Sequence, residues 1–191
     1  MAGLIAVSYF LISIFFNLII FIFWLRILLR YYRVSPLHPM GQLIYRLTDR
    51  IALPLESIVF RNKKHPQRFD AISFACIIVL EIVKFMLLSL IAYQRLLPIT
   101  YLFLLVAADL IIQLGDLLFY ALLLRVIMSW INPQWQMHPA AMILNLITDP
   151  LIKIGHKIIP NISGFDFAPF IVMVIIKIIT LFISASLPIH L

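Results

Sequence analysis

Six polar or charged side chains stand inside otherwise apolar stretches of the sequence, and their types could do chemistry. They are Asn17, Glu81, Lys84, Asp109, Asp116 and Lys177. A charge at the centre of a bilayer is costly, so such residues indicate either an ion or proton path or buried pairs that fix helix packing. Asp109 and Asp116 lie, with Gln113, at i, i+7 and i+4 on one helix face. That face is a natural partner for Lys84 or Lys177.

Catalytic and cofactor-binding patterns do not occur in the sequence. It contains no HExxH, Gly-rich phosphate loop, nucleophile elbow or CxxC. His38 and His138 could form a pair, but two histidines lack the three or four ligands that zinc requires. The single cysteine, Cys76, cannot form an internal disulfide. We therefore expect no enzymatic activity, no cofactor and no metal.

The composition indicates that lipid surrounds most of the chain. Its 191 residues are 64% hydrophobic and only 12% charged, which leaves too few polar groups to cover a water-facing surface. Four apolar segments exceed the roughly 20 residues needed to cross a bilayer: 5–30, 71–93, 101–131 and 167–187. The first is not expected to be a cleaved signal peptide, because its charges, Arg26 and Arg30, follow the apolar run.

The basic residues predict the topology. Seven of the fifteen Lys and Arg residues lie in the 31–70 loop, and the 131–166 loop adds Lys153 and Lys157. The link between the second and third apolar segments has only Arg95. The positive-inside rule then places both loops in the cytoplasm and both termini outside. The rule also accounts for the net charge of +7, so we expect the lipid bilayer as a partner and no nucleic acid.

The chain contains an internal repeat. Three dipeptides of the first half recur in order in the second, at offsets of 99, 100 and 96: Leu25-Arg26 at Leu124-Arg125, Thr48-Asp49 at Thr148-Asp149, and Phe69-Asp70 at Phe165-Asp166. The repeats 1–95 and 96–191 each contribute two spans, so both enter the membrane in the same direction. We predict an all-α membrane protein with four transmembrane helices in a tandem parallel repeat. Glu81 and Lys177 then lie at equal depth with opposite charge.

Each repeat also contains an amphipathic segment, 39–59 or 139–159. In the second, the apolar residues Ile143, Ile147, Leu151, Ile154 and Ile158 recur at helical spacing. Charges interrupt both segments too soon for a span, so each is predicted to be a cytoplasmic helix lying in the membrane interface. Pro54 and Pro150 should break or kink these helices.

Several aspartates and prolines are typical of helix ends. Asp149 followed by Pro150 predicts a helix start, with aspartate as N-cap and proline at the first position. Asp70 and Asp166 precede apolar helices that they would cap, and Pro169 falls in a first turn. Alternatively, Asp49, Asp149 and the basic residues form a docking surface for a partner or for lipid headgroups.

These residues carry a resemblance to the YggT family of bacterial membrane proteins, which includes the YlmG proteins. The shared positions of the second half are Thr148-Asp149-Pro150-Leu151, Lys153, His156-Lys157, Ile159-Pro160, Gly164 and Asp166-Phe167-Ala168-Pro169-Phe170. The family has a proline at Ile154, an arginine pair at His156-Lys157 and a serine at Ala168. The resemblance implies a multi-pass inner-membrane protein linked to osmotic tolerance, division and assembly of membrane complexes.

Two functions remain open from the sequence. The first is a non-enzymatic scaffold, or an assembly or stress-tolerance factor of the cell envelope, which binds other membrane proteins or a second copy of itself. The second is a small channel or transport subunit that uses the midplane charges. The basic interfacial helices favour the first, and the intramembrane ionisable residues favour the second.

Overall fold

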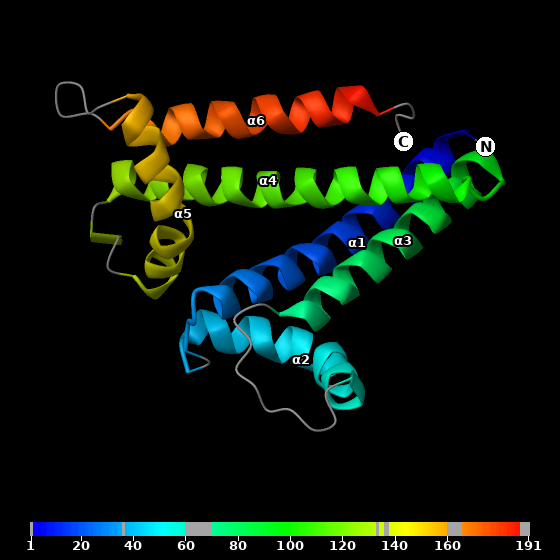
Figure 1. The fold of residues 1–191 in the computed structure, drawn as a ribbon, viewed down its shortest axis with the longest axis horizontal. Coiled ribbons are helices and arrows are strands. Elements are labelled where there is room, and N and C mark those ends of the chain that lie inside the picture. The colour runs from blue at the N-terminus through cyan, green and yellow to red at the C-terminus, as the bar shows by residue number, and fades with distance from the viewer. Residues whose placement is uncertain are drawn as a thin grey trace. The chain divides into compact units, whose positions relative to one another are not determined.

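The computed structural model describes residues 2–35, 37–59, 70–132, 134–135, 138–159 and 166–187. Within these ranges the chain is all-α, as predicted, and forms six helices (Figure 1): α1 (Ala2–Tyr31), α2 (Pro39–Val59), α3 (Ala71–Tyr93), α4 (Ile99–Ile131), α5 (Pro139–Ile158) and α6 (Ala168–Ser186).

The four predicted spans are confirmed as helices. α1, α3, α4 and α6 are each long and apolar enough to cross a membrane, and their bounds fall within three residues of those predicted from the apolar runs. The chain divides into two compact units inside α4, after Leu110. Asp109, in the part of α4 that belongs to the first unit, accepts a hydrogen bond from Lys84 on α3.

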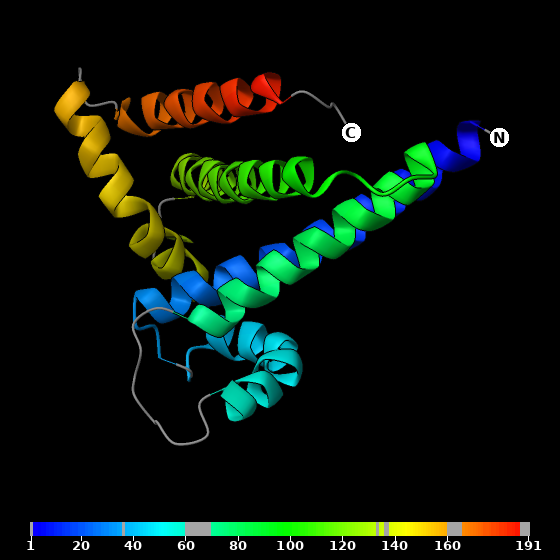
Figure 2. The same ribbon diagram turned by 45° about the vertical axis from the view of Figure 1, so that its right-hand side comes forward.

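In the first unit, α1 and α3 lie side by side along their length, as both ribbon views show (Figures 1 and 2). Ile20 and Phe23 of α1 and Ile77 of α3 are almost completely buried, and Trp24 meets Phe74 edge to face at 6.1 Å between ring centroids. These contacts bury the shared face of the two helices and fix their relative register.

In the second unit, α5 packs against α6. The buried core joins α4, α5 and α6, with Leu122, Val126, Ile152, Ala168, Val172 and Met173. Gly155 permits the closest approach, because a Cβ there would lie 2.9 Å from the Ala168 carbonyl oxygen. Gly115 plays the same part between α4 and α6, where a Cβ would lie 2.6 Å from Thr180 Cγ2. Both glycines are thus required by packing, as is common between membrane helices.

The segments 39–59 and 139–159 are helices, but one detail of their prediction is wrong. Helices α2 and α5 continue through Pro54 and Pro150, and in both views the axis of α2 bends in its C-terminal half, in line with the predicted break or kink (Figures 1 and 2). Asp149 and Pro150 do not start a helix, because α5 begins at Pro139 and its N-cap is His138. Burial of Ile147 before Pro150 and of Ile152 after it keeps both halves of α5 on one packed face.

Candidate functional site

The first unit contains a polar cluster around the Lys84 ammonium group. Lys84 Nζ donates to Asn17 Oδ1 at 3.1 Å and lies 2.7 Å from Glu81 Oε2. It also donates to Asp109 on α4. Glu81 is completely buried and Lys84 is 3% exposed. Three helices, α1, α3 and α4, therefore contribute oxygen atoms to one buried cation.

The second unit contains a simpler pair. Lys177 Nζ on α6 donates to Asp116 Oδ1 on α4 at 2.6 Å, and lies 4.7 Å from the centroid of the Phe119 ring. About a third of each charged side chain is exposed in this chain. Lys177 was expected to pair with Glu81 or Asp116. It pairs with Asp116, while Glu81 contacts Lys84.

The two polar sites occupy positions that the sequence repeat pairs. Asn17 corresponds to Asp116 at an offset of 99, and Glu81 to Lys177 at an offset of 96. At the same offset Lys84 corresponds to Thr180, which is also buried. Each unit thus places polar groups at equivalent positions, but with different residue types. The first unit has a cation held by several acceptors, and the second has a single ion pair.

A second feature of the first unit is a clamp made by Arg26 near the end of α1. Arg26 Nη1 donates to Thr48 Oγ1 at 2.7 Å and to Asp49 Oδ1 at 2.5 Å, while Nε donates to Asp70 Oδ2 at 3.0 Å. Arg26 is 3% exposed. The guanidinium group therefore joins α1, α2 and the start of α3, because its several N–H donors point to different acceptors at once.

Asp70 has two roles in this clamp. It is the N-cap of α3, where its Oδ1 accepts from the Ser73 N–H at 3.1 Å, and its Oδ2 lies 3.1 Å from Arg30 Nη1. Burial raises the pKa of the Asp70 carboxyl, but the hydrogen bonds from Ser73 and the charge of Arg30 outweigh it and leave the pKa below its usual value. The carboxylate is therefore ionised and fixed.

The second unit repeats part of the clamp. Arg125 Nη1 donates to Thr148 Oγ1 at 2.7 Å and to Asp149 Oδ1 at 2.6 Å. Asp166, the counterpart of Asp70, instead accepts from the Ala168 N–H and lies 3.0 Å from His156 Nε2. Asp149 is therefore a ligand of Arg125 rather than a helix cap, and the second clamp is more exposed than the first.

Two further residues of the family motif, Pro169 and Gly164, take no part in the clamps that the structure describes. Pro169 is buried in the first turn of α6, and Gly164 lies outside the described residues. The clamps were not predicted from the sequence, in which Arg26 marked the end of the first apolar run and the Thr-Asp dipeptides marked the repeat and a helix start. The signal was present, since both the arginine and its Thr-Asp partner recur at nearly the same offset.

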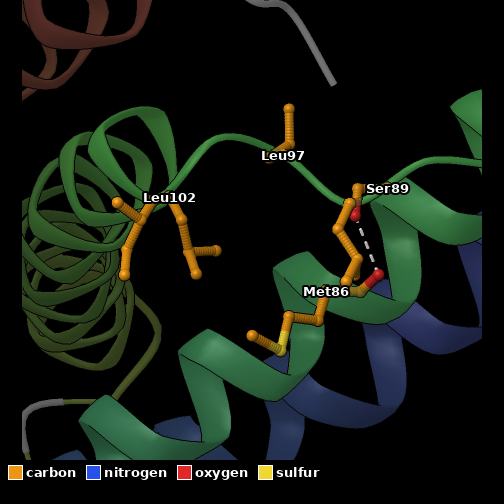
Figure 3. Close-up of a pocket in the computed structure, with 6 residues that line it drawn as sticks. Met86, Ser89, Leu97 and Leu102 are labelled. Atoms are coloured by element: carbon orange, nitrogen blue, oxygen red, sulfur yellow. Dashed lines mark hydrogen bonds between the residues drawn. The ribbon is translucent and has the colours of Figure 1, made fainter.

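The structure offers no clear site for a substrate or metal among the residues it describes. A cavity of about 170 Å³ lies at the link between α3 and α4, near Met86, Ser89, Leu97 and Leu102 (Figure 3). Its lining is almost entirely apolar, whereas ligand sites combine apolar walls with several converging polar groups. No group of three metal-ligating side chains occurs in the described part of the chain.

Comparison with known proteins identifies the relatives. The sequence profile of the CCB3/YggT family matches residues 5–91 and 104–187. The chain is 31% identical to an uncharacterized Vibrio alginolyticus protein in the proC 3′ region, over 86% of each chain. It is 25% identical to the uncharacterized protein YggT of Escherichia coli K12, over 93% of this chain and 89% of that one. No solved structure matches. The chain is thus a multi-pass membrane protein with four spanning helices, and it belongs to the CCB3/YggT family.

Proposed function

We propose that this protein is a non-enzymatic scaffold of the bacterial inner membrane, which presents α2 and α5 at the cytoplasmic surface to proteins assembled there. The observation that carries the proposal is the recurrence of one clamp. In both units an arginine near the end of a spanning helix binds a Thr-Asp pair on the next helix. Such a clamp holds a surface helix at a fixed position beside the membrane.

The exposed faces of the clamped helices suit this role. α2 exposes apolar side chains at Leu43, Leu47 and Ile51, with the exposed Arg46 and Arg50 between them. A helix with apolar and basic side chains of this kind lies in a membrane interface and is attracted to anionic lipid. α5 likewise exposes Ile154 and Ile158, although Ile147 of the predicted stripe is buried inside the unit.

The ion pairs inside the spans support a rigid scaffold. Lys84 and Lys177 each have a carboxylate partner, and such pairs between membrane helices fix their register. This weakens the alternative of a channel or transport subunit. The assembly or stress-tolerance role in the cell envelope, which the family resemblance implies, is compatible with a scaffold.

Photo-crosslinking in native membranes tests the scaffold. A photoreactive residue at Leu47 on α2 or Ile154 on α5 should capture a defined protein, whereas one at Leu181, an exposed position on α6, should not. Asp149→Ala removes the partly exposed clamp of α5 and should reduce capture from Ile154 but not from Leu47. Equal capture at all three positions, or capture from Ile154 that ignores Asp149→Ala, would contradict the proposal.

Fusions to alkaline phosphatase test the topology. The Lys and Arg distribution predicts that a fusion after Leu191 is active, because the enzyme folds outside the cytoplasm, and that a fusion at Lys63 is inactive. The measured quantity is phosphatase activity relative to fusion-protein abundance. The opposite pattern would place the clamped helices outside the cell and remove the scaffold from the cytoplasmic face.

A further inference from the structure

Two arginines on α2 carry charges that no described acid neutralises. Arg46 and Arg50 are exposed and lie four residues apart, so they are neighbours on one side of the helix. Neither forms an ion pair with a residue that the structure describes. Asp49, which lies between them in the sequence, is bound instead by Arg26 of the clamp. The clamp therefore takes up the nearest acid and leaves two guanidinium groups on the surface of α2.

Exposed apolar side chains lie next to these arginines. Leu43 precedes Arg46 by three residues, Leu47 precedes Arg50 by three, and both leucines are exposed. Residues at this spacing are neighbours on a helix surface. The face of α2 that carries Ile44 is buried in the first unit, so it is not available to a ligand. The exposed side of α2 thus combines two positive charges with apolar surface.

The clamp also sets the depth of α2 in the bilayer. Arg26, which donates to Thr48 and Asp49 on α2, lies five residues before the end of α1 at Tyr31. At 1.5 Å per residue, five residues of helix span about 8 Å. The interfacial layer on each side of the hydrocarbon core is roughly as thick. The clamp therefore holds α2 at the level of the lipid headgroups.

The second unit has the clamp but lacks the arginine pair. At the repeat offset of 100, Leu146 and Pro150 of α5 stand where α2 has its two arginines. The exposed basic residues Lys153 and Lys157 lie later in α5. A guanidinium group can donate two parallel hydrogen bonds to a phosphate, whereas a lysine ammonium acts as a point charge. Recognition of a phosphate is therefore expected of α2 in particular.

We propose that Arg46 and Arg50 bind the phosphate headgroup of an anionic phospholipid, whose acyl chains lie beside Leu43. An anionic lipid has both the negative charge and the apolar chains that complement this side of α2. A zwitterionic headgroup matches it less well, because choline balances the phosphate. The inference rests on the proposed function only for the place of α2 at the membrane surface. It adds a lipid of defined charge as a ligand of one surface helix.

Fluorescence quenching in lipid nanodiscs tests this site. The full-length protein with Cys76→Ser and Leu43→Cys is labelled at position 43 with a fluorophore. The nanodiscs contain phosphatidylcholine and phosphatidylglycerol, one of which carries a quenching nitroxide on an acyl chain. The measured quantity is the association constant of phosphatidylglycerol relative to phosphatidylcholine at position 43. We expect a preference of about 10- to 25-fold, because each arginine near anionic lipid contributes roughly a factor of five.

Arg46→Gln combined with Arg50→Gln should abolish this preference. Both side chains are exposed, so the double variant should keep the helical content of the parent protein. Lys153→Gln combined with Lys157→Gln is the matched control, because it removes the same net charge from α5. It should leave the preference at position 43 unchanged. Glycerol phosphate added to the buffer should also leave it unchanged, because a soluble phosphate has no acyl chain to place beside α2.

Equal association of the two lipids with the parent protein would overturn the proposal, whatever the variants show. An equal loss from the α5 control would overturn it as well, because net charge alone would then explain the preference. Displacement of the lipid by glycerol phosphate would show a site for soluble anions instead. The scaffold is tested separately by cross-linking from Ile154 on α5, so a failure of the lipid site can be told from a failure of the scaffold.

Discussion

Arg26→Gln should lower the free energy of unfolding by about 3–5 kcal/mol, the range for removing one partner of a buried ion pair. The Arg26 guanidinium group is 3% exposed and joins Thr48, Asp49 and Asp70. Its loss leaves Asp70, whose side chain is only 2% exposed, with Arg30 as its remaining basic partner among the described residues. Thermal or denaturant unfolding in mild detergent measures the change.

Arg125→Gln is the matched control, because the sequence repeat pairs Arg125 with Arg26. Here the side chains of Arg125 and Asp149 are 27% and 51% exposed, so solvent screens the pair and the expected loss is at most about 1 kcal/mol. Equal losses from the two substitutions would show that burial of the Arg26 clamp does not determine its contribution. The comparison is sharp because both arginines make the same contacts to threonine and aspartate.

The helices themselves could be predicted from the sequence, because their cause is local. An apolar run longer than a bilayer is thick forms a helix to satisfy its own backbone, so the bounds of the spans were predicted to within three residues. Asp70 was likewise expected to cap α3, and it does accept from the Ser73 N–H. In both cases the residues next to one another in the sequence were enough to predict the structure.

The partners of the charged residues could not be predicted in the same way. The spacing of Asp109 and Asp116 placed them on one helix face but left open which lysine each would bind. That choice depends on which spans pack together, and packing brings Lys84 to Asp109 and Lys177 to Asp116. The role of Asp149 could not be predicted for the same reason. Its sequence is typical of a helix cap, but in the fold it accepts a hydrogen bond from Arg125.

The sequence repeat explains why the clamps recur and the buried clusters differ. The clamp needs the same donor and acceptors in each unit to hold its surface helix, and both units keep arginine, threonine and aspartate. At the equivalent positions inside the spans, only polar groups with partners are required. Glu81 with Lys84 in one unit and Lys177 with Asp116 in the other are two solutions to that requirement.

Lys84→Met should lower the free energy of unfolding by about 3–5 kcal/mol. The substitution removes a cation that contacts both Glu81 and Asp109 and leaves the two acids without it. Adding Asp109→Asn should restore part of the loss, because the double variant has one acid fewer to bury. We expect a coupling free energy of about 1–3 kcal/mol between the two sites, within the range found for residues in direct contact.

Lys177→Met and Asp116→Asn, alone and together, form the parallel cycle in the second unit. These side chains are 36% and 37% exposed, so their coupling should be smaller than that of Lys84 and Asp109. Both cycles are measured by unfolding in the same detergent, with helical content confirming that each variant is folded at the start. Additive losses for Lys84 and Asp109 would show that the two residues are uncoupled. A Lys177→Met loss as large as that of Lys84→Met would show that burial does not separate the two sites.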